Sequence, residues 1–132
     1  MIGLDTNVIV RYLAQDDARQ AAAATRLIEG SLSATTRGFV SIVTLAEVVW
    51  VMSSSYRASR TAVADIVEGL LTALQLTLEK ADVVWRALRA HRKSAADFSD
   101  ALIVELGQDA GCSKTVTFDP RAAAHPGFEA LR

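Results

Sequence analysis

The sequence contains 132 residues, of which 51% are hydrophobic and 22% charged, with a formal net charge of −1 and a single cysteine, Cys112. These values exclude a disordered chain, a disulfide framework and a bulk attraction to nucleic acid, and the length predicts one domain over residues 1–132. No apolar run is long enough to cross a membrane and the first residues lack a signal-peptide pattern, so we expect a cytoplasmic protein.

The first half of the chain twice shows a short strand that runs directly into a helix. Residues 2–4 are apolar, and from Val8 onward apolar residues recur at helical spacing. A second helix is expected over residues 17–30, between a good N-cap aspartate and a glycine that favours a helix end. Residues 39–42 then predict another strand, which is followed by a helix that carries residues 45–52.

The second half continues this alternation. The clearest amphipathic helix covers residues 60–74, where apolar residues recur at i, i+3, i+4, i+7 and i+8. Residues 74–78 fit either a short strand or the end of that helix. Helices are then expected over 81–88 and 97–110, and a β-branched strand over 115–118. The alternation predicts an α/β fold with a mainly parallel sheet, in which ligands bind beyond the carboxyl ends of the strands.

Five acidic residues lie where this fold is expected to bring them together, after strands or in the helices that follow: Asp5, Glu47, Asp97, Asp100 and Asp119. Asp97 and Asp100 are about 60° apart around a helix, so both can point to one place. Neighbouring carboxylates repel each other, so a cluster of three or more needs a cation to stay ionised. Oxygen ligands without histidine or cysteine select Mg²⁺ or Mn²⁺, which predicts metal-assisted hydrolysis of phosphodiester bonds.

Each acid also has a purely structural interpretation. Asp5 fits the N-cap of the first helix, and Asp97 with Asp100 fit a cap followed by a carboxylate that the helix dipole favours. Residues 44–47 have the form of a capping box, in which the glutamate bonds back to the backbone. Asp119 precedes a proline, as in an ordinary turn. Both interpretations stay open for each residue.

Four motifs stand in order along the chain: Met-Ile-Gly-Leu-Asp-Thr-Asn at 1–7, Ser-x-x-Thr-Leu-Ala-Glu at 41–47, Asp-Phe-Ser-Asp-Ala-Leu-Ile at 97–103 and Thr-Phe-Asp at 117–119. Together they resemble the motifs of PIN-domain proteins, and more narrowly those of the VapC toxins of bacterial toxin–antitoxin modules. The resemblance covers essentially the whole chain. It implies a three-layer α/β/α sandwich, a Mg²⁺- or Mn²⁺-dependent endoribonuclease and a homodimer. It also implies a VapB-type antitoxin as partner, and the protein would contact DNA only indirectly, through this antitoxin.

The resemblance also assigns roles to residues. It implies that the metal-binding acids are Asp5, Glu47, Asp97, Asp100 and Asp119. Asp97 matches an additional acid that only part of the family has, so it is left out of the catalytic set. The resemblance therefore implies that the catalytic residues are Asp5, Glu47, Asp100 and Asp119. Polar residues that would orient the carboxylates or water are Thr6, Asn7 and Thr117, each of which also fits a cap or a turn.

Two other classes of function stay open. In a phosphotransfer protein Asp5 would be the nucleophile, but Asn7 stands where one such class has a second aspartate. A non-catalytic PIN-like binding module would use the same surface to recruit a partner, although it has no need of a full acidic set. The chain lacks G-x-x-x-x-G-K-[ST], H-E-x-x-H and G-x-S-x-G motifs, which argues against nucleotide hydrolysis, zinc proteolysis and serine hydrolysis.

A basic stripe is expected on the helix that begins near residue 81, formed by Arg86, Arg89, Arg92 and Lys93. It fits either contacts with RNA phosphates or a solvated helix face. Trp50 and Trp85 are expected in the core or at an interface rather than as base-stacking residues. We also expect His91 at the surface and Cys112 in the core.

Overall fold

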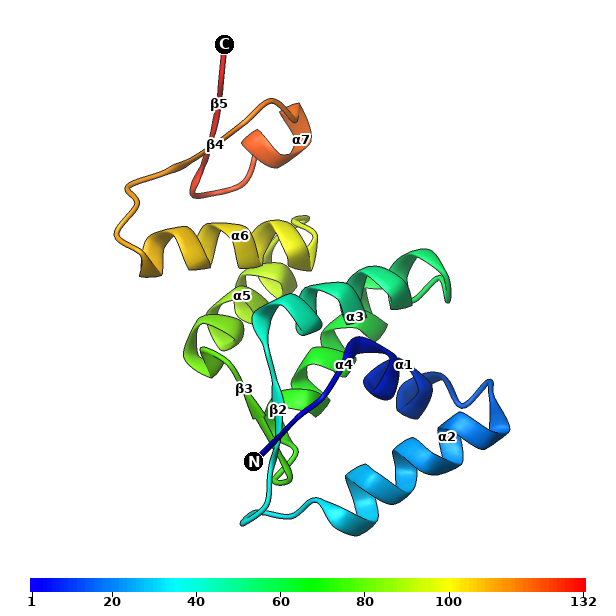
Figure 1. Cartoon of the computed structure of the whole chain (residues 1–132). Helices are drawn as coiled ribbons and strands as arrows, with labels where there is room; N and C mark the ends of the chain where they lie inside the picture. The colour runs from blue at the N-terminus through cyan, green and yellow to red at the C-terminus, as the bar shows by residue number, and fades with distance from the viewer. The chain divides into compact units, whose positions relative to one another are not determined.

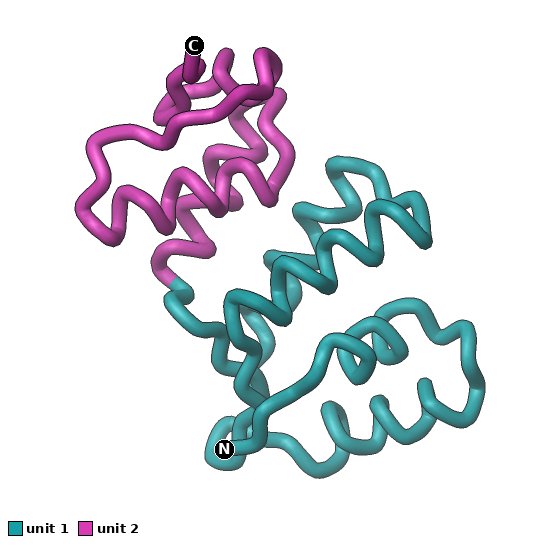
Figure 2. Tube along the Cα trace, turned by 45° about the horizontal axis from the view of Figure 1, so that its top comes forward, with its two compact units in different colours: residues 1–81 teal, residues 82–132 magenta.

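A computed structural model describes all 132 residues of the chain, which form seven α-helices, one π-helical segment and five short strands (Figure 1). The residues group into two compact units, unit 1 (Met1–Ala81) and unit 2 (Asp82–Arg132), coloured separately in Figure 2. Each unit has its own buried apolar residues and its own parallel strands. The single domain expected over residues 1–132 stays a prediction.

In unit 1 three strands form a parallel sheet, in the order β1 (Ile2–Gly3), β2 (Gly38–Val40) and β3 (Leu76–Leu78). Parallel neighbours need long crossover connections, and the helices between the strands supply them. A glycine suits position 38, because a Cβ there would lie only 2.8 Å from Leu32 Cδ1 and 2.9 Å from Leu4 Cδ1. The carboxyl ends of all three strands lie at one edge of this sheet.

The helices of unit 1 are α1 (Thr6–Ala14), α2 (Ala18–Thr25), α3 (Ile42–Ser54) and α4 (Arg60–Thr72). Helix α2 continues into a π-helical segment, η1 (Arg26–Ser31), after which Leu32 N donates to Leu27 O, five residues back. Helix α1 packs against α2 and α3, α3 packs against α4, and α4 packs against β3. Their apolar faces bury a core that includes Ile9, Val40, Leu45, Val48 and Val67.

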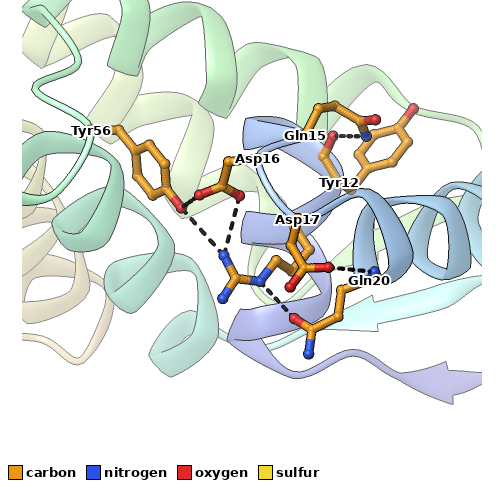
Figure 3. Close-up of polar contacts among 7 residues, drawn as sticks. Tyr12, Gln15, Asp16, Asp17, Gln20 and Tyr56 are labelled. Atoms are coloured by element: carbon orange, nitrogen blue, oxygen red, sulfur yellow. Dashed lines mark hydrogen bonds and ion pairs between the residues drawn. The ribbon is translucent and has the colours of Figure 1, made fainter.

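A polar network joins the loop between α1 and α2 to the turn after α3 (Figure 3). Arg11 Nη1 lies 3.2 Å from Asp16 Oδ1, and Tyr56 Oη donates a 2.6 Å hydrogen bond to Asp16 Oδ2. Arg11 Nε donates to Gln20 Oε1 at 2.7 Å. The hydrogen bond from Tyr56 lowers the pKa of Asp16, and the charge of Arg11 lowers this pKa further. The same hydrogen bond raises the pKa of Tyr56, because the phenol must keep its proton to donate it.

Unit 2 contains α5 (Ala81–Lys93), α6 (Phe98–Asp109), β4 (Thr115–Thr117), α7 (Pro120–Ala123) and β5 (Phe128–Ala130). Strands β4 and β5 pair in parallel. Helices α5 and α6 bury a core that includes Val83, Val84, Leu88, Phe98 and Leu102. The chain makes its turn before β5 at Gly127, whose φ of +90° is a left-handed conformation that glycine adopts without strain.

The structure confirms the α/β fold with a mainly parallel sheet. The segment 74–78, which fitted a strand or a helix end, contains strand β3. The strands expected over 39–42 and 115–118 are shorter, and β5 was not predicted, because three residues after a turn show no periodicity. None of the helices is long and apolar enough to cross a membrane.

Two single-residue predictions differ from the structure, and for Trp50 only the interface alternative stays a prediction. His91 is buried, with Nδ1 2.8 Å from Ala96 O and its ring edge-on to Phe98, so the expectation of a surface histidine was wrong. Cys112 is exposed rather than buried, because it lies in the loop after α6. Trp50 lies outside the core, whereas Trp85 is half-buried.

Candidate active site

Asp5 is the N-cap of α1, two residues after the end of β1 and at the carboxyl edge of the unit 1 sheet. Its Oδ1 accepts a 2.8 Å hydrogen bond from Thr6 N, so the N-cap interpretation is confirmed. The side chain is exposed, and Oδ2 has no hydrogen-bond partner. One oxygen therefore fixes the carboxylate to the helix, while the other is available to a ligand.

Glu47 lies on α3, and the structure excludes its interpretation as part of a capping box. The N-cap of α3 is Ser41, whose Oγ accepts a 3.1 Å hydrogen bond from Thr44 N. Thr44 is therefore already inside the helix, and Glu47 is more than a turn away from the cap. The Glu47 side chain is exposed and makes no hydrogen bond or ion pair. Since β1 and β2 are parallel neighbours, α1 and α3 both begin at the same edge of the sheet.

The other three acids belong to unit 2, where Asp97 and Asp100 lie at the start of α6 and Asp119 follows β4. Asp97 occupies the N-cap position without making a capping hydrogen bond. Burial raises the pKa of Asp100, and the nearby negative charges of Asp97 and Asp119 raise it further. The positive charges of His125 and Arg121 act in the opposite direction. The structure thus brings these three carboxylates of unit 2 close enough to repel each other.

This donor set fits a hard divalent cation in its chemistry. All five side chains offer carboxylate oxygens, the ligands that Mg²⁺ and Mn²⁺ prefer. Burial is the largest cause of the raised pKa of Asp100, and the repulsion that Asp97 and Asp119 add is of the kind that a bound cation relieves. No group of three or more Asp, Glu, His or Cys side chains is arranged tightly enough to hold a metal ion.

A model of the PIN domain matches residues 2–127. The chain belongs to the PIN-domain family. PIN domains are a superfamily of nucleases that generally use divalent metal ions, so membership supports a nuclease role. The matched range includes all five acids. No curated protein matches the sequence.

Polar neighbours hold two of the acids of this PIN domain in place. Thr117 Oγ1 accepts a 3.0 Å hydrogen bond from Asp119 N, and Asp119 Oδ1 accepts a 2.9 Å bond from Arg121 N. Thr6 is buried and holds Asp5 through its backbone N–H, whereas Asn7 is exposed. Thr117 therefore fixes the backbone that carries Asp119, which fits its interpretation as a turn former, and a role in orienting the carboxylates stays a prediction.

Sequence reasoning missed two residues near Asp100 in unit 2 of this PIN domain. Arg121 and His125 both favour the ionised form of Asp100. The signal for Arg121 was its position two residues after Asp119, in the same short turn. His125 has no local sequence signal, because the path of the chain after α7 brings it near Asp100.

The basic stripe on α5 divides into residues with different environments. Arg86 makes ion pairs with three acids of unit 2, namely Asp82 (3.5 Å), Glu105 (3.3 Å) and Asp109 (3.8 Å). This residue therefore links α5 to α6 and is not free to contact RNA. Arg89 and Lys93 are exposed and make no ion pair, so their two interpretations stay open.

Proposed function

We propose that this PIN domain is a metal-dependent endoribonuclease that acts as the toxin of a VapBC-type toxin–antitoxin module. The observation that carries the proposal is the grouping of three acids in unit 2, where burial and then the charges of Asp97 and Asp119 raise the pKa of Asp100. Burial and like charges disfavour the ionised Asp100 carboxylate although Arg121 and His125 partly offset them, and a bound divalent cation would lower that free-energy cost. The family match supports the nuclease part of the proposal.

In this proposal the acids that hold Mg²⁺ or Mn²⁺ are Asp5, Glu47, Asp97, Asp100 and Asp119, and the catalytic residues are Asp5, Glu47, Asp100 and Asp119. When bound, the ion supplies Lewis acidity, which activates water towards the phosphodiester and stabilises the leaving oxygen. Thr6 and Thr117 keep Asp5 and Asp119 in fixed orientations through the hydrogen bonds described above.

The proposed partners are an RNA substrate, a second copy of the chain in a homodimer, and a VapB-type antitoxin that alone contacts DNA. A cavity of about 460 Å³ between α1 and α2 supports the antitoxin part of the proposal. Its floor is apolar, formed by Val8, Ala24 and Leu27, and Arg11 and Gln20 line its polar side. Such a groove suits an amphipathic protein segment. We propose a cytoplasmic location for the complex.

The test combines cleavage with antitoxin binding. Purified protein is incubated with total cellular RNA in Mg²⁺, in Mn²⁺ and in EDTA, and products are resolved on a gel. We expect cleavage with either metal and none in EDTA. The product of the neighbouring small gene should co-purify with the chain and suppress cleavage, because an antitoxin arginine can pair bidentately with the acids.

Two results would replace this proposal by its alternatives. Binding of RNA without cleavage in any metal would indicate a non-catalytic PIN-like module. A stable beryllofluoride adduct at Asp5 would indicate a phosphotransfer protein with Asp5 as its nucleophile.

A further inference from the structure

Two large aromatic side chains stand exposed next to the proposed metal-binding acids, one in each unit. Trp50 on α3 is 67% exposed and follows Glu47 by three residues. Phe118 is 80% exposed and directly precedes Asp119. Aromatic residues usually bury most of their surface, so two such residues beside the acids of a nuclease-family domain need a physical explanation.

On α3 the exposed aromatic residue and the acid share one helix face. Val43, Glu47 and Trp50 are spaced i, i+4 and i+7, which places them in one row along the helix. All three are exposed, whereas the opposite side of α3 buries residues such as Leu45 and Val48 in the core of unit 1. A ligand whose backbone reaches the Glu47 carboxylate would therefore find the Trp50 indole one helical turn away.

In unit 2 the aromatic residue, the acid and a cation occupy four consecutive positions. Phe118 leaves the end of β4, Asp119 follows, and Arg121 has a side chain that is 95% exposed. The Arg121 Nε lies 4.0 Å from Asp119 Oδ1, a long ion pair that leaves most of the guanidinium donors unused. The hydrogen bonds of Thr117 and Asp119 in this turn hold the backbone that presents Phe118.

We propose that Trp50 in unit 1 and Phe118 in unit 2 each stack on a base of single-stranded RNA beside the acid that each adjoins, Glu47 and Asp119, with Arg121 binding a phosphate next to Phe118. This proposal rests on the proposed function. An aromatic ring, a cation and a metal-binding acid match the three parts of a nucleotide: base, phosphate backbone and scissile bond. A protein interface would instead place its aromatic residues in a patch depleted of charge, whereas each ring here adjoins charged side chains. A net charge of −1 gives no bulk attraction to RNA, so affinity depends on local contacts such as these.

The test measures RNA affinity without cleavage. Fluorescence anisotropy of a labelled, short single-stranded RNA is recorded with the full chain in EDTA, for wild type, Trp50→Ala and Phe118→Ala. We expect each alanine variant to bind at least about fivefold more weakly, as for the loss of one stacked base. Trp50→Phe and Phe118→Tyr should recover most of the affinity, because both keep an aromatic ring.

Leu74→Ala is the matched control. Leu74 is 72% exposed in unit 1, but it precedes β3 and so lies at the edge of the sheet opposite Asp5. Its loss should leave RNA affinity unchanged, and circular dichroism melting should show that every variant is folded. In a Trp85→Phe background, where Trp50 is the only tryptophan, RNA should quench the remaining fluorescence.

Three results would overturn the proposal. If both alanine variants bind as tightly as wild type while wild type binds RNA, the stacking role is refuted and the proposed function stands. If Trp50→Ala changes the oligomeric state in light scattering without changing RNA affinity, Trp50 belongs to a protein interface. If wild type neither binds nor cleaves RNA, the proposed function and the stacking role both fail.

Discussion

Replacing Asp100 by asparagine tests whether the acids of unit 2 act as one electrostatic group. Burial and the charges of Asp97 and Asp119 disfavour the ionised Asp100 carboxylate in the folded state. Asparagine keeps the size of the side chain and removes the charge. We therefore expect Asp100→Asn to be more stable than wild type in EDTA at neutral pH.

The expected gain is small because solvent screens a partly exposed group. Relief from two like-charged neighbours is worth about 0.2–0.5 kcal/mol each, whereas loss of a first-turn carboxylate costs about 0.3–1 kcal/mol of helix-dipole stabilisation. These two effects nearly cancel, and burial, the largest cause of the raised pKa of Asp100, tips the balance, so we expect a net gain of at most about 0.5 kcal/mol. For 132 residues this raises the Tm by about 2 °C.

The pH dependence of this gain has a defined sign. Because the folded-state pKa of Asp100 is raised, the wild-type contribution is present below the unfolded value of 3.8 and is lost as pH rises through the folded pKa. The advantage of Asp100→Asn should therefore appear at neutral pH and vanish below about pH 3.8.

Metal then reverses the order of the two proteins. At a hundredfold excess over its Kd, Mn²⁺ should stabilise wild type by about 2.7 kcal/mol, or about 10 °C in Tm. A tenfold weaker site in Asp100→Asn would halve that shift. The assay is thermal unfolding of both proteins in EDTA and in Mn²⁺. Equal Mn²⁺ shifts in both, with no gain for the variant in EDTA, would refute the shared site.

Three further changes test other parts of the structure. Tyr56→Phe removes the hydrogen bond to Asp16, and thermal melting across pH should show the resulting loss of stability at neutral pH. Because the folded-state pKa of Asp16 is lowered, this loss should fade below about pH 3.8. Because the folded-state pKa of Tyr56 is raised, the loss should also fade above about pH 10. A pH-independent cost would contradict this network. Gly127→Ala should lower the free energy of unfolding in urea by about 1–3 kcal/mol, because φ at this position is +90° and the new Cβ would clash with the Val104 side chain. An unchanged urea midpoint would mean that the turn relaxes without cost. Arg86→Met should lower the free energy of unfolding by about 1 kcal/mol, because it removes partly exposed ion pairs. Its RNA affinity should stay within twofold of wild type. A larger loss of affinity would place this residue in the RNA site.

The positions of the acids along the fold were predictable because two signals agreed. Short apolar runs followed by helical spacing locate Asp5 and Asp119 after strands, and the structure places both there. The capping of α3 was not predictable, because Ser41 and Thr44 both begin a plausible capping motif. Only the structure shows that Ser41 accepts the hydrogen bond and that Glu47 has no such role.

Burial of single residues was the least predictable feature. His91 lies on the apolar stripe of α5, and its burial depends on a carbonyl at position 96 that returns to accept its Nδ1 hydrogen bond. Trp50 continues the apolar run of α3, but its spacing from Glu47 places it on the exposed face. The burial of a single side chain depends on which element packs against each face of its helix. The local sequence does not determine this packing.

The central claim is that these acids make the chain a metal-dependent ribonuclease, and matched glutamate variants test it most directly. Cleavage of a labelled RNA in Mn²⁺ is measured for wild type, Glu47→Gln and Glu129→Gln, where Glu129 is an exposed acid on β5 outside the proposed site. We expect Glu47→Gln to lose at least about 100-fold in rate while Glu129→Gln cleaves as wild type does. Cleavage by Glu47→Gln at the wild-type rate, or equal losses in both variants, would contradict the account.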